Sequence, residues 1–153
     1  DHLPLYRQER IFLRHGVALS RRTTCGWMAT CAELLEPIRR AMLDRVLLSR
    51  VLGTDDTPVK VQDPDTGAMS TGRIWDYIGD RANPFVVYDF TPDRCASGPM
   101  RVLAGFRGEF LQADAYSGYD QLFARGVLEA GCMASPAIAG SICAGATALT
   151  ARP

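Results

Sequence analysis

The sequence predicts a mixed α/β fold that follows a helical segment, and three observations support this. Apolar residues recur every three or four positions between Trp27 and Val46, which is the spacing of one helix face. From residue 50 onward the chain changes to short apolar and β-branched runs separated by turn residues. These runs alternate with two short helical stretches in the order three strands, helix, strand, helix, strand, which is typical of a mixed sheet.

Residues 1–50 are predicted to be helical. Pro4 suits the first turn of a helix that runs to about His15, and Ser20 is expected to cap a second helix. The apolar stripe of this second helix runs through Pro37 without losing phase, so we expect one helix with a kink or a short break there. We expect the stripe to pack as core against the following domain. A helix-turn-helix has the same outline, but helical hairpins that only pack are commoner.

The strands are expected at five places, with a short helix before the fourth and another before the fifth. Pro58 argues for an edge or a bend in the first strand, because proline cannot donate a hydrogen bond to a neighbouring strand. The fourth strand can lie parallel beside the first, since a helix connects the third strand to it. The predicted strands cover residues 51–61, 73–78, 85–90, 108–113 and 127–132, and the predicted helices lie within 92–105 and 117–123.

Length and composition fit a globular protein. The 153 residues can form one domain with a real core or a small domain with an appendage, and 47% of them are hydrophobic. No run of eighteen apolar residues predicts a membrane span, and no stretch has the pattern of a signal peptide. We therefore expect a cytoplasmic chain that does not associate with membranes.

The cysteines argue against two kinds of site. Their number, 5, is odd, they are widely spaced, and none forms a C-x-x-C pair. His2 and His15 lie far from most of them along the chain. A zinc site and a disulfide framework are therefore both disfavoured, and we expect free thiols that are buried or half-buried in a reducing compartment.

Charge is distributed unevenly although the net charge is zero. Residues 1–50 hold nine Arg and five acidic residues, a net charge of +4, whereas residues 51–153 hold eight basic and twelve acidic residues, a net charge of −4. A basic first third can favour a polyanion such as DNA. A solvated helical surface explains the same charge, and charge alone favours that explanation.

Two aspartates are the candidate metal ligands. Asp55 and Asp114 each stand at the polar end of a strand-like run, and the ends of neighbouring parallel strands meet at one edge of a sheet. Carboxylates there could share divalent ions that activate an attacking oxygen and stabilise a leaving one. The alternative is that both residues cap loops, because aspartate is common where a strand ends.

Several segments resemble insertion-sequence transposases of the IS66 type, and they occur in the order of that family. The resemblance covers about residues 1–132. The segments are Asp1-His2-Leu3-Pro4-Leu5-Tyr6-Arg7-Gln8, Gly53-Thr54-Asp55-Asp56-Thr57-Pro58-Val59, Thr71-Gly72-Arg73-Ile74-Trp75, Leu103-Ala104-Gly105-Phe106-Arg107-Gly108 and Leu111-Gln112-Ala113-Asp114-Ala115-Tyr116-Ser117-Gly118-Tyr119.

The resemblance implies a ribonuclease H-like catalytic core over residues 51–132, with a D-D-E catalytic triad that uses Mg²⁺ or Mn²⁺. Such enzymes cut DNA at transposon ends and join the freed 3′ hydroxyls to target DNA. On this mapping Asp55 is the first triad acid and Asp114 the second, and both are metal ligands. Asp56 matches an acidic neighbour in the family, for which we expect a capping or solvated role. The implied partners are transposon-end and target DNA and either a second copy or a full-length transposase, in the bacterial nucleoid.

The sequence departs from the family in several places. Gly53-Thr54 stands where the family has His-Ala, and Cys132-Met133-Ala134-Ser135 stands where it has Cys-Trp-Ala-His. Glu129 is the last acidic residue, and it precedes the place of the family's triad Glu, so we do not assign it that role. Residues 133–153 form an aberrant small-residue tail, either flexible or read out of frame. We therefore expect a disrupted, N-terminally incomplete transposase that lacks the third acid and is inactive.

Other functions fit less well. A non-catalytic fragment that binds DNA or oligomerises would use the basic residues 1–50. A small metal-dependent phosphatase or nuclease with two acids would need a further His or Asp near Asp55. Catalysis by a serine or cysteine nucleophile lacks a G-x-S-x-G element and a well-placed histidine. The loss of a covering helix would also leave an exposed apolar sheet face that favours aggregation or a partner.

Overall fold

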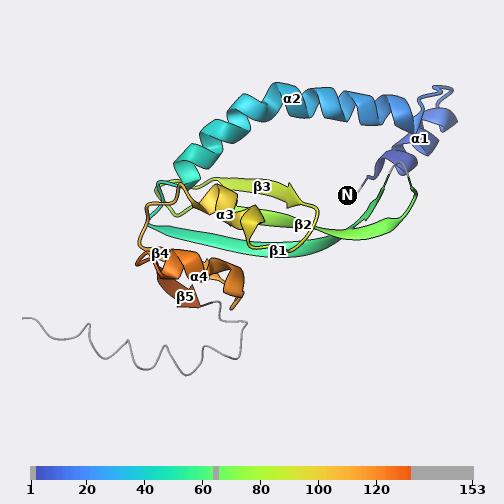
Figure 1. Ribbon diagram of the computed structural model, residues 1–153. Coiled ribbons are helices and arrows are strands. Elements are labelled where there is room, and N and C mark those ends of the chain that lie inside the picture. The colour runs from blue at the N-terminus through green and yellow to red at the C-terminus, as the bar shows by residue number, and fades with distance from the viewer. Residues whose placement is uncertain (1–2, 64–65, 132–153) are drawn as a thin grey trace, which may run out of the picture. The chain divides into compact units, whose positions relative to one another are not determined.

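The computed structural model describes residues 3–63 and 66–131, and Figure 1 draws the others in grey. The chain forms two compact units, one up to Arg40 and one from Ala41 onward. Helix α2 contributes most of its length to the first unit, here called the helical unit, and its last turns to the second, here called the sheet unit. None of the helices within the described ranges is long and apolar enough to cross a membrane.

The helical unit contains α1 and α2 as far as Arg40. Helix α1 spans Leu5–Arg14 and follows the extended residue Pro4. Helix α2 spans Arg21–Val46 and begins where expected, because the Ser20 hydroxyl accepts the backbone N–H of Thr23 at 3.2 Å and so caps the helix. Pro37 lies inside α2, so the chain keeps one helix there, without a break.

The apolar stripe of α2 does not form core over most of its length. Trp27, Leu34, Leu35 and Ile38 are 56%, 73%, 56% and 58% exposed, and the described residues up to Arg40 hold no fully buried apolar side chain. These turns therefore form no core within the helical unit, and packing of the stripe against the following domain stays a prediction. Helical periodicity identifies a face that can be covered, but it does not identify the layer that covers it.

Only the end of the stripe reaches a core. Val46 is completely buried, and Met42 packs against the same cluster in the sheet unit. The expectation that the cysteines are buried is also wrong where the structure describes them. Cys25, Cys31 and Cys95 are free and exposed.

The sheet unit is built on five strands in the order β3-β2-β1-β4-β5. Strand β1 pairs with β2 and β2 with β3 in antiparallel fashion, whereas β4 pairs in parallel with both β1 and β5. This confirms a mixed α/β fold with the fourth strand parallel to the first, as in a ribonuclease H-like sheet. The elements are β1 (Val51–Gln62), β2 (Met69–Ile78), β3 (Val86–Thr91), α3 (Ser97–Leu103), β4 (Phe110–Ala113), η1 (Ser117–Tyr119), α4 (Asp120–Phe123) and β5 (Leu128–Gly131).

One face of this sheet is covered by the short helices and carries the core (Figure 1). Side chains that alternate along the strands point into it, as the period of two in a strand requires. The covering side chains come from α3, η1, α4, the end of α2 and the loop after α3. The buried set is Val46, Leu52, Trp75, Tyr77, Val87, Leu103, Phe106, Leu111, Ala113, Tyr119 and Leu122.

The opposite face of β2 and β3 carries apolar side chains that are exposed among the described residues. The large ones are each between 39% and 62% exposed. The strand pairing in this half of the sheet explains why a proline is tolerated at position 58. Strand β4 pairs only with the first three residues of β1, so Pro58 lies where β2 is the one described neighbour of β1. The exposed set is Ile74, Ile78, Val86, Tyr88 and Phe90.

Candidate metal centre

Strands β1 and β4 position the two aspartates that the sequence predicts as metal ligands. The strands pair in parallel from Val51↔Phe110 to Gly53↔Gln112, with partners offset by 59 positions along the chain. Asp55 and Asp114 are separated by the same 59 positions, and each lies two residues beyond the last pair. Because neighbouring strands lie about 4.8 Å apart, continuing the register brings the two carboxylates together.

The strands diverge just after the pairing ends, which opens the site. Strand β1 continues into its hairpin with β2, whereas β4 ends at Ala113. The chain then turns, and the backbone N–H of Tyr116 donates to the carbonyl of Asp114 at 2.7 Å. Asp55 is exposed and Asp114 is half-buried, so solvent and solutes can reach both.

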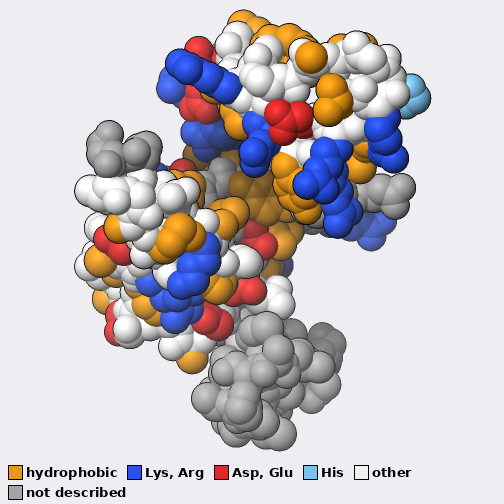
Figure 2. Space-filling view, turned by 90° about the vertical axis from the view of Figure 1, so that its right-hand side faces the viewer, with side chains coloured by type: hydrophobic (Ala, Val, Ile, Leu, Met, Phe, Trp, Pro, Cys, Tyr) orange, Lys and Arg blue, Asp and Glu red, His pale blue; other side chains and the backbone are white. Residues whose placement is uncertain are grey.

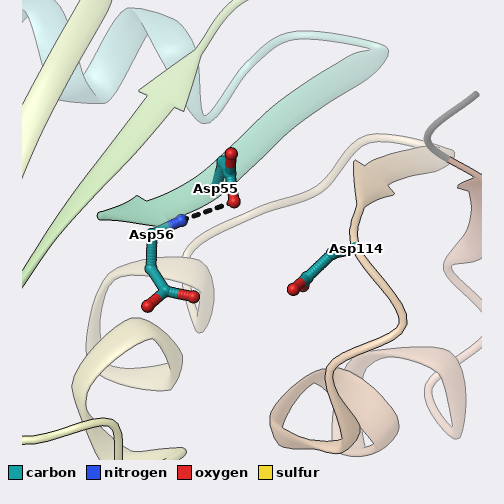
Figure 3. Close-up of side chains that lie close together, drawn as sticks. All are labelled: Asp55, Asp56 and Asp114. Carbon is teal, nitrogen blue, oxygen red and sulfur yellow. Dashed lines mark hydrogen bonds between the residues drawn. The ribbon is translucent and has the colours of Figure 1, made fainter. Parts of the chain in front are cut away.

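A third carboxylate joins them. Asp55, Asp56 and Asp114 each offer an oxygen, and these oxygens all lie within 4.8 Å of one another. Figure 3 shows the side chains of Asp55 and Asp56 on either side of β1, with Asp114 extending toward them from the end of β4. The backbone N–H of Asp56 donates to Asp55 Oδ1 at 2.8 Å. Three carboxylates this close repel one another unless positive charge lies between them.

Asp56 receives that charge from two arginines. Its side chain is only 2% exposed, and its oxygens lie 2.8 Å from Arg73 Nη1 and 2.6 Å from Arg94 Nη2. The expectation that Asp56 is a capping or solvated residue is therefore wrong. The alternation of side chains along β1 predicts the burial of Asp56, because Asp56 is in phase with Leu52 and Thr54, which face the covered side of the sheet.

Arg94 was not predicted as part of the site. It lies in the connection between β3 and α3, and its guanidinium contacts Asp56 and also Asp114, at 3.0 Å. These carboxylates, Asp56 above all, raise the pKa of Arg94 above its usual value. The guanidinium lies 4.6 Å from the ring centre of Tyr116, whose hydroxyl donates to the Arg94 carbonyl. Nothing in the sequence pattern singles out this arginine, because the contact depends on how a loop folds back.

Asp76 is a further carboxylate next to the site. It lies opposite Asp55 in the β1–β2 register, and its Oδ1 accepts the backbone N–H of Asp55 at 2.8 Å. Partial burial raises the pKa of Asp76 above its ordinary value, although the hydrogen bond from Asp55 opposes this. Asp76 therefore fixes the backbone that carries Asp55.

The donor set fits a hard divalent cation. Mg²⁺ and Mn²⁺ prefer oxygen ligands, and Mg²⁺ commonly uses one or two carboxylates and keeps several waters. Asp55 and Asp114 can supply such ligands from two different strands. Within residues 3–63 and 66–131, these two and Asp56 form the one group of three or more potential ligands close enough to hold an ion. The described histidine, His15, belongs to the helical unit, at the end of α1.

The fold and the site together define a class of protein. It is a mixed α/β domain in which carboxylates cluster at the point where β1 and β4 diverge. The chain matches the family described as Transposase IS66 family over residues 1–135. It belongs to the IS66 transposase family.

Similar proteins include two from Sinorhizobium fredii (strain NBRC 101917 / NGR234). The uncharacterized protein y4qI is 37% identical over 128 residues, which is 80% of this chain and 24% of y4qI. The uncharacterized protein y4hP is 32% identical over 127 residues, which is 79% of this chain and 22% of y4hP. The chain thus spans about a quarter of the length of these relatives.

A solved structure also resembles the chain. It is the cryoEM structure of the simian T-cell lymphotropic virus intasome in complex with PP2A regulatory subunit B56 gamma, with 10% identity and a TM-score of 0.39. The likeness covers 66% of this chain and 38% of that one. At this TM-score it supports no conclusion about fold or function.

Proposed function

We propose that Asp55 and Asp114 hold a divalent ion, Mg²⁺ or Mn²⁺, and are two of the three acids of a site that, when complete, cuts transposon ends and joins their 3′ hydroxyls to target DNA. The observation that supports this is the parallel register of β1 and β4, which places carboxylates 59 positions apart in one cluster. Membership of a transposase family supports DNA as the substrate.

The residues of the cluster take different roles. A bound divalent ion lowers the pKa of an attacking oxygen and neutralises charge that develops on a phosphodiester. Asp55 and Asp114 are accessible and would bind the ion from two strands. Asp56 is already neutralised by Arg73 and Arg94, so it holds these arginines in place and is not a ligand.

The chain also lacks an acid for a complete triad. No acidic residue follows Glu129 in the sequence. Glu129 lies in β5, where its register partner is Leu111 on β4 rather than a residue of β1. We therefore propose that the 153-residue chain by itself binds the ion but does not cut or join DNA, because charge in the transition state is less well neutralised.

Metal binding can be tested directly with Mn²⁺, whose free form gives an electron paramagnetic resonance spectrum. Titration of the purified chain with Mn²⁺ should show a site that is lost in Asp55→Asn and in Asp114→Asn. Asp120→Asn changes an exposed acid at the start of α4 and should leave binding intact. Equal binding by all four proteins would show that the two aspartates do not form the site.

The proposed inactivity has its own test. The chain is incubated with Mg²⁺ or Mn²⁺ and DNA that carries transposon ends, and the products are resolved on a denaturing gel. We expect no cleavage and no strand transfer. Robust activity that Asp55→Ala abolishes would contradict the proposed inactivity while supporting the proposed metal site.

DNA binding without catalysis is a second candidate function, and the surface of α1 favours it. Arg7, Arg10 and Arg14 follow the spacing of one helix face and are exposed. None of the ion pairs within the described ranges involves them. Figure 2 shows arginine side chains, in blue, among hydrophobic ones on the helical unit, in the upper part of that view.

Salt dependence tests this candidate. Filter binding to duplex DNA should weaken as salt rises. An Arg→Gln change on α1 that removes one charge from the DNA phosphates should reduce the slope of log K against log salt by about 0.9. Arg125→Gln, after α4, is a control with the same change of charge. A lack of affinity even at low salt would remove this candidate.

Self-association, or association with a full-length transposase, is favoured by the exposed stripe of α2. Exposed apolar side chains in a row typically mark a surface that a partner covers. Sedimentation velocity should show association that depends on concentration and is weakened by Leu34→Lys with Ile38→Lys. A chain that remains monomeric at high concentration would argue against association between copies.

A further inference from the structure

Arg94 bridges two carboxylates of the cluster. Its Nη2 lies 2.6 Å from Asp56 Oδ1 and 3.0 Å from Asp114 Oδ2, so one nitrogen bridges two carboxylates that come from different strands. Its Nε adds a second bond to Asp56 Oδ1 at 2.9 Å. The guanidinium is therefore the positive charge that allows Asp56 and Asp114 to lie close together.

The loop that carries Arg94 is tied to the same corner as Asp114. The hydroxyl of Tyr116 donates to the backbone carbonyl of Arg94, and the Tyr116 ring lies beneath the guanidinium. Two residues earlier, Asp114 accepts the backbone N–H of Tyr116 on its own carbonyl. These bonds hold the backbone of Arg94 near the site even when its side chain moves.

The two carboxylates depend on Arg94 to different degrees. Asp56 has a second arginine, because Arg73 from β2 contacts its other oxygen at 2.8 Å, with 24% of the Arg73 side chain exposed. Among the described residues, Arg94 is the one ion-pair partner of Asp114. If the guanidinium left, Asp56 would stay neutralised within the protein, whereas Asp114 would become free to bind another cation.

We propose that Arg94 is a built-in counter-ion that competes with the divalent ion for Asp114, so that metal binding requires its guanidinium to release that carboxylate. This inference rests on the proposed function, because it concerns the same metal site. Arg94 is a positioning residue here. In the metal-free protein it holds Asp114 toward Asp55 and Asp56, and its exchange with the ion weakens the apparent metal affinity.

Competition predicts that removing the charge of Arg94 strengthens metal binding. Arg94→Met keeps an apolar side chain of similar length and should bind Mn²⁺ about tenfold more tightly than wild type, the effect of losing one partly screened charge. Arg94→Lys keeps a charge but loses the second bond that Arg94 Nε makes to Asp56, so its affinity should lie between those of wild type and Arg94→Met. Arg101→Met removes a nearby arginine that pairs with Asp89 outside the cluster, and should change nothing.

A second measurement uses the wild-type chain and does not depend on how the variants fold. The Nε–Hε signal of Arg94 in a ¹⁵N–¹H spectrum, assigned by its loss in Arg94→Lys, should shift when Mg²⁺ is added. The corresponding signals of Arg73 and Arg101 should move less. Thermal unfolding of each variant shows whether it is folded under the conditions of the titration.

The outcomes separate this inference from the proposed function. Tighter Mn²⁺ binding by Arg94→Met but not by Arg101→Met supports competition, as does binding that appears in Arg94→Met alone. Equal affinity in wild type and Arg94→Met, with an unmoved Arg94 signal, overturns the inference and leaves the metal site standing. Weaker binding by Arg94→Met also overturns it, since Arg94 would then assist the ligands. No binding by either protein removes the metal site and this inference together.

Discussion

Trp75 donates its indole N–H to the hydroxyl of Thr91 at 2.7 Å in the core of the sheet unit. That hydroxyl donates in turn to the carbonyl of Asp93 at 2.6 Å. The two bonds connect the completely buried Trp75 to the start of the loop that carries Arg94. A side-chain bond between β2 and β3 thus also fixes the entry to the candidate site.

Thr91→Val tests this connection. The change keeps the shape of the side chain but leaves the buried indole N–H without a partner, so we expect a loss of about 1–3 kcal/mol in the free energy of unfolding. Urea denaturation followed by circular dichroism measures it. Thr91→Ser is the control, because it keeps the hydroxyl and removes one methyl group. If the valine variant were as stable as the serine variant, the hydrogen bond would contribute little.

Replacing glycine with alanine should have opposite effects on stability at Gly26 and at Gly108. Gly26 lies inside α2, and a Cβ there would meet nothing within 4 Å, so Gly26→Ala should stabilise the helix by about 0.5–1 kcal/mol. A Cβ at Gly108 would lie 2.2 Å from the backbone carbonyl oxygen of Ser49, so Gly108→Ala must displace backbone and should destabilise. Thermal unfolding compares both variants with wild type. A tolerated alanine at position 108 would contradict the close approach.

An ion-pair network on α2 predicts a dependence on pH. Hydrogen bonds from Arg39 and Arg40 lower the pKa of Glu36 from 4.5 to about 2. Because the folded-state pKa lies below the unfolded value, this contribution is present above pH 4.5 and is lost as pH falls toward 2. Helicity measured by circular dichroism should therefore fall across this window, and by less in Glu36→Gln.

A neighbouring acid is the control for that experiment. Glu33 lies on the same helix and takes part in none of the ion pairs found within the described residues. Glu33→Gln should keep the response to pH seen in wild type. An equal reduction in both variants would mean that total charge, and not the Glu36 network, causes the response.

The exposed stripe predicts a contrast between two leucines. Leu34 is 73% exposed, so Leu34→Gln should change the free energy of unfolding by no more than about 0.5 kcal/mol. Leu111 is completely buried, so Leu111→Ala should cost about 2–5 kcal/mol. Both are measured by urea denaturation of dilute, monomeric protein. A loss above about 1.5 kcal/mol for Leu34→Gln would show that the stripe is packed.

The sheet could be predicted well from the sequence because its signals are local. β-Branched and aromatic runs with Gly, Pro and Asp between them marked all five strands, and the strand β2 differs mainly in beginning at Met69 and not at residue 73. The parallel pairing of β1 and β4 followed from the helix between β3 and β4. Pro58 indicated correctly that the outer half of β1 has a free edge.

The contacts that complete the site could not be predicted in the same way. The approach of Asp55 and Asp114 follows from strand order, but the arginines on Asp56 depend on the β2 register and on a loop that folds back. The α2 stripe shows the converse, since a clear period predicted burial where side chains such as Leu34 are exposed. The sequence pattern of one helix or strand does not specify where the neighbouring elements lie.

The parallel pairing that frames the site is only three residues long, and beyond Asp56 the outer β1–β2 arm extends to Gln62↔Met69. Beyond Arg73 toward the tip of this arm, the two strands pair only with each other among the described residues. Matched insertions or deletions in both strands of the hairpin therefore leave the carboxylates in register, so the site does not set the length of the arm. A single residue inserted between Gly53 and Asp55 would instead turn that aspartate to the other side of the sheet.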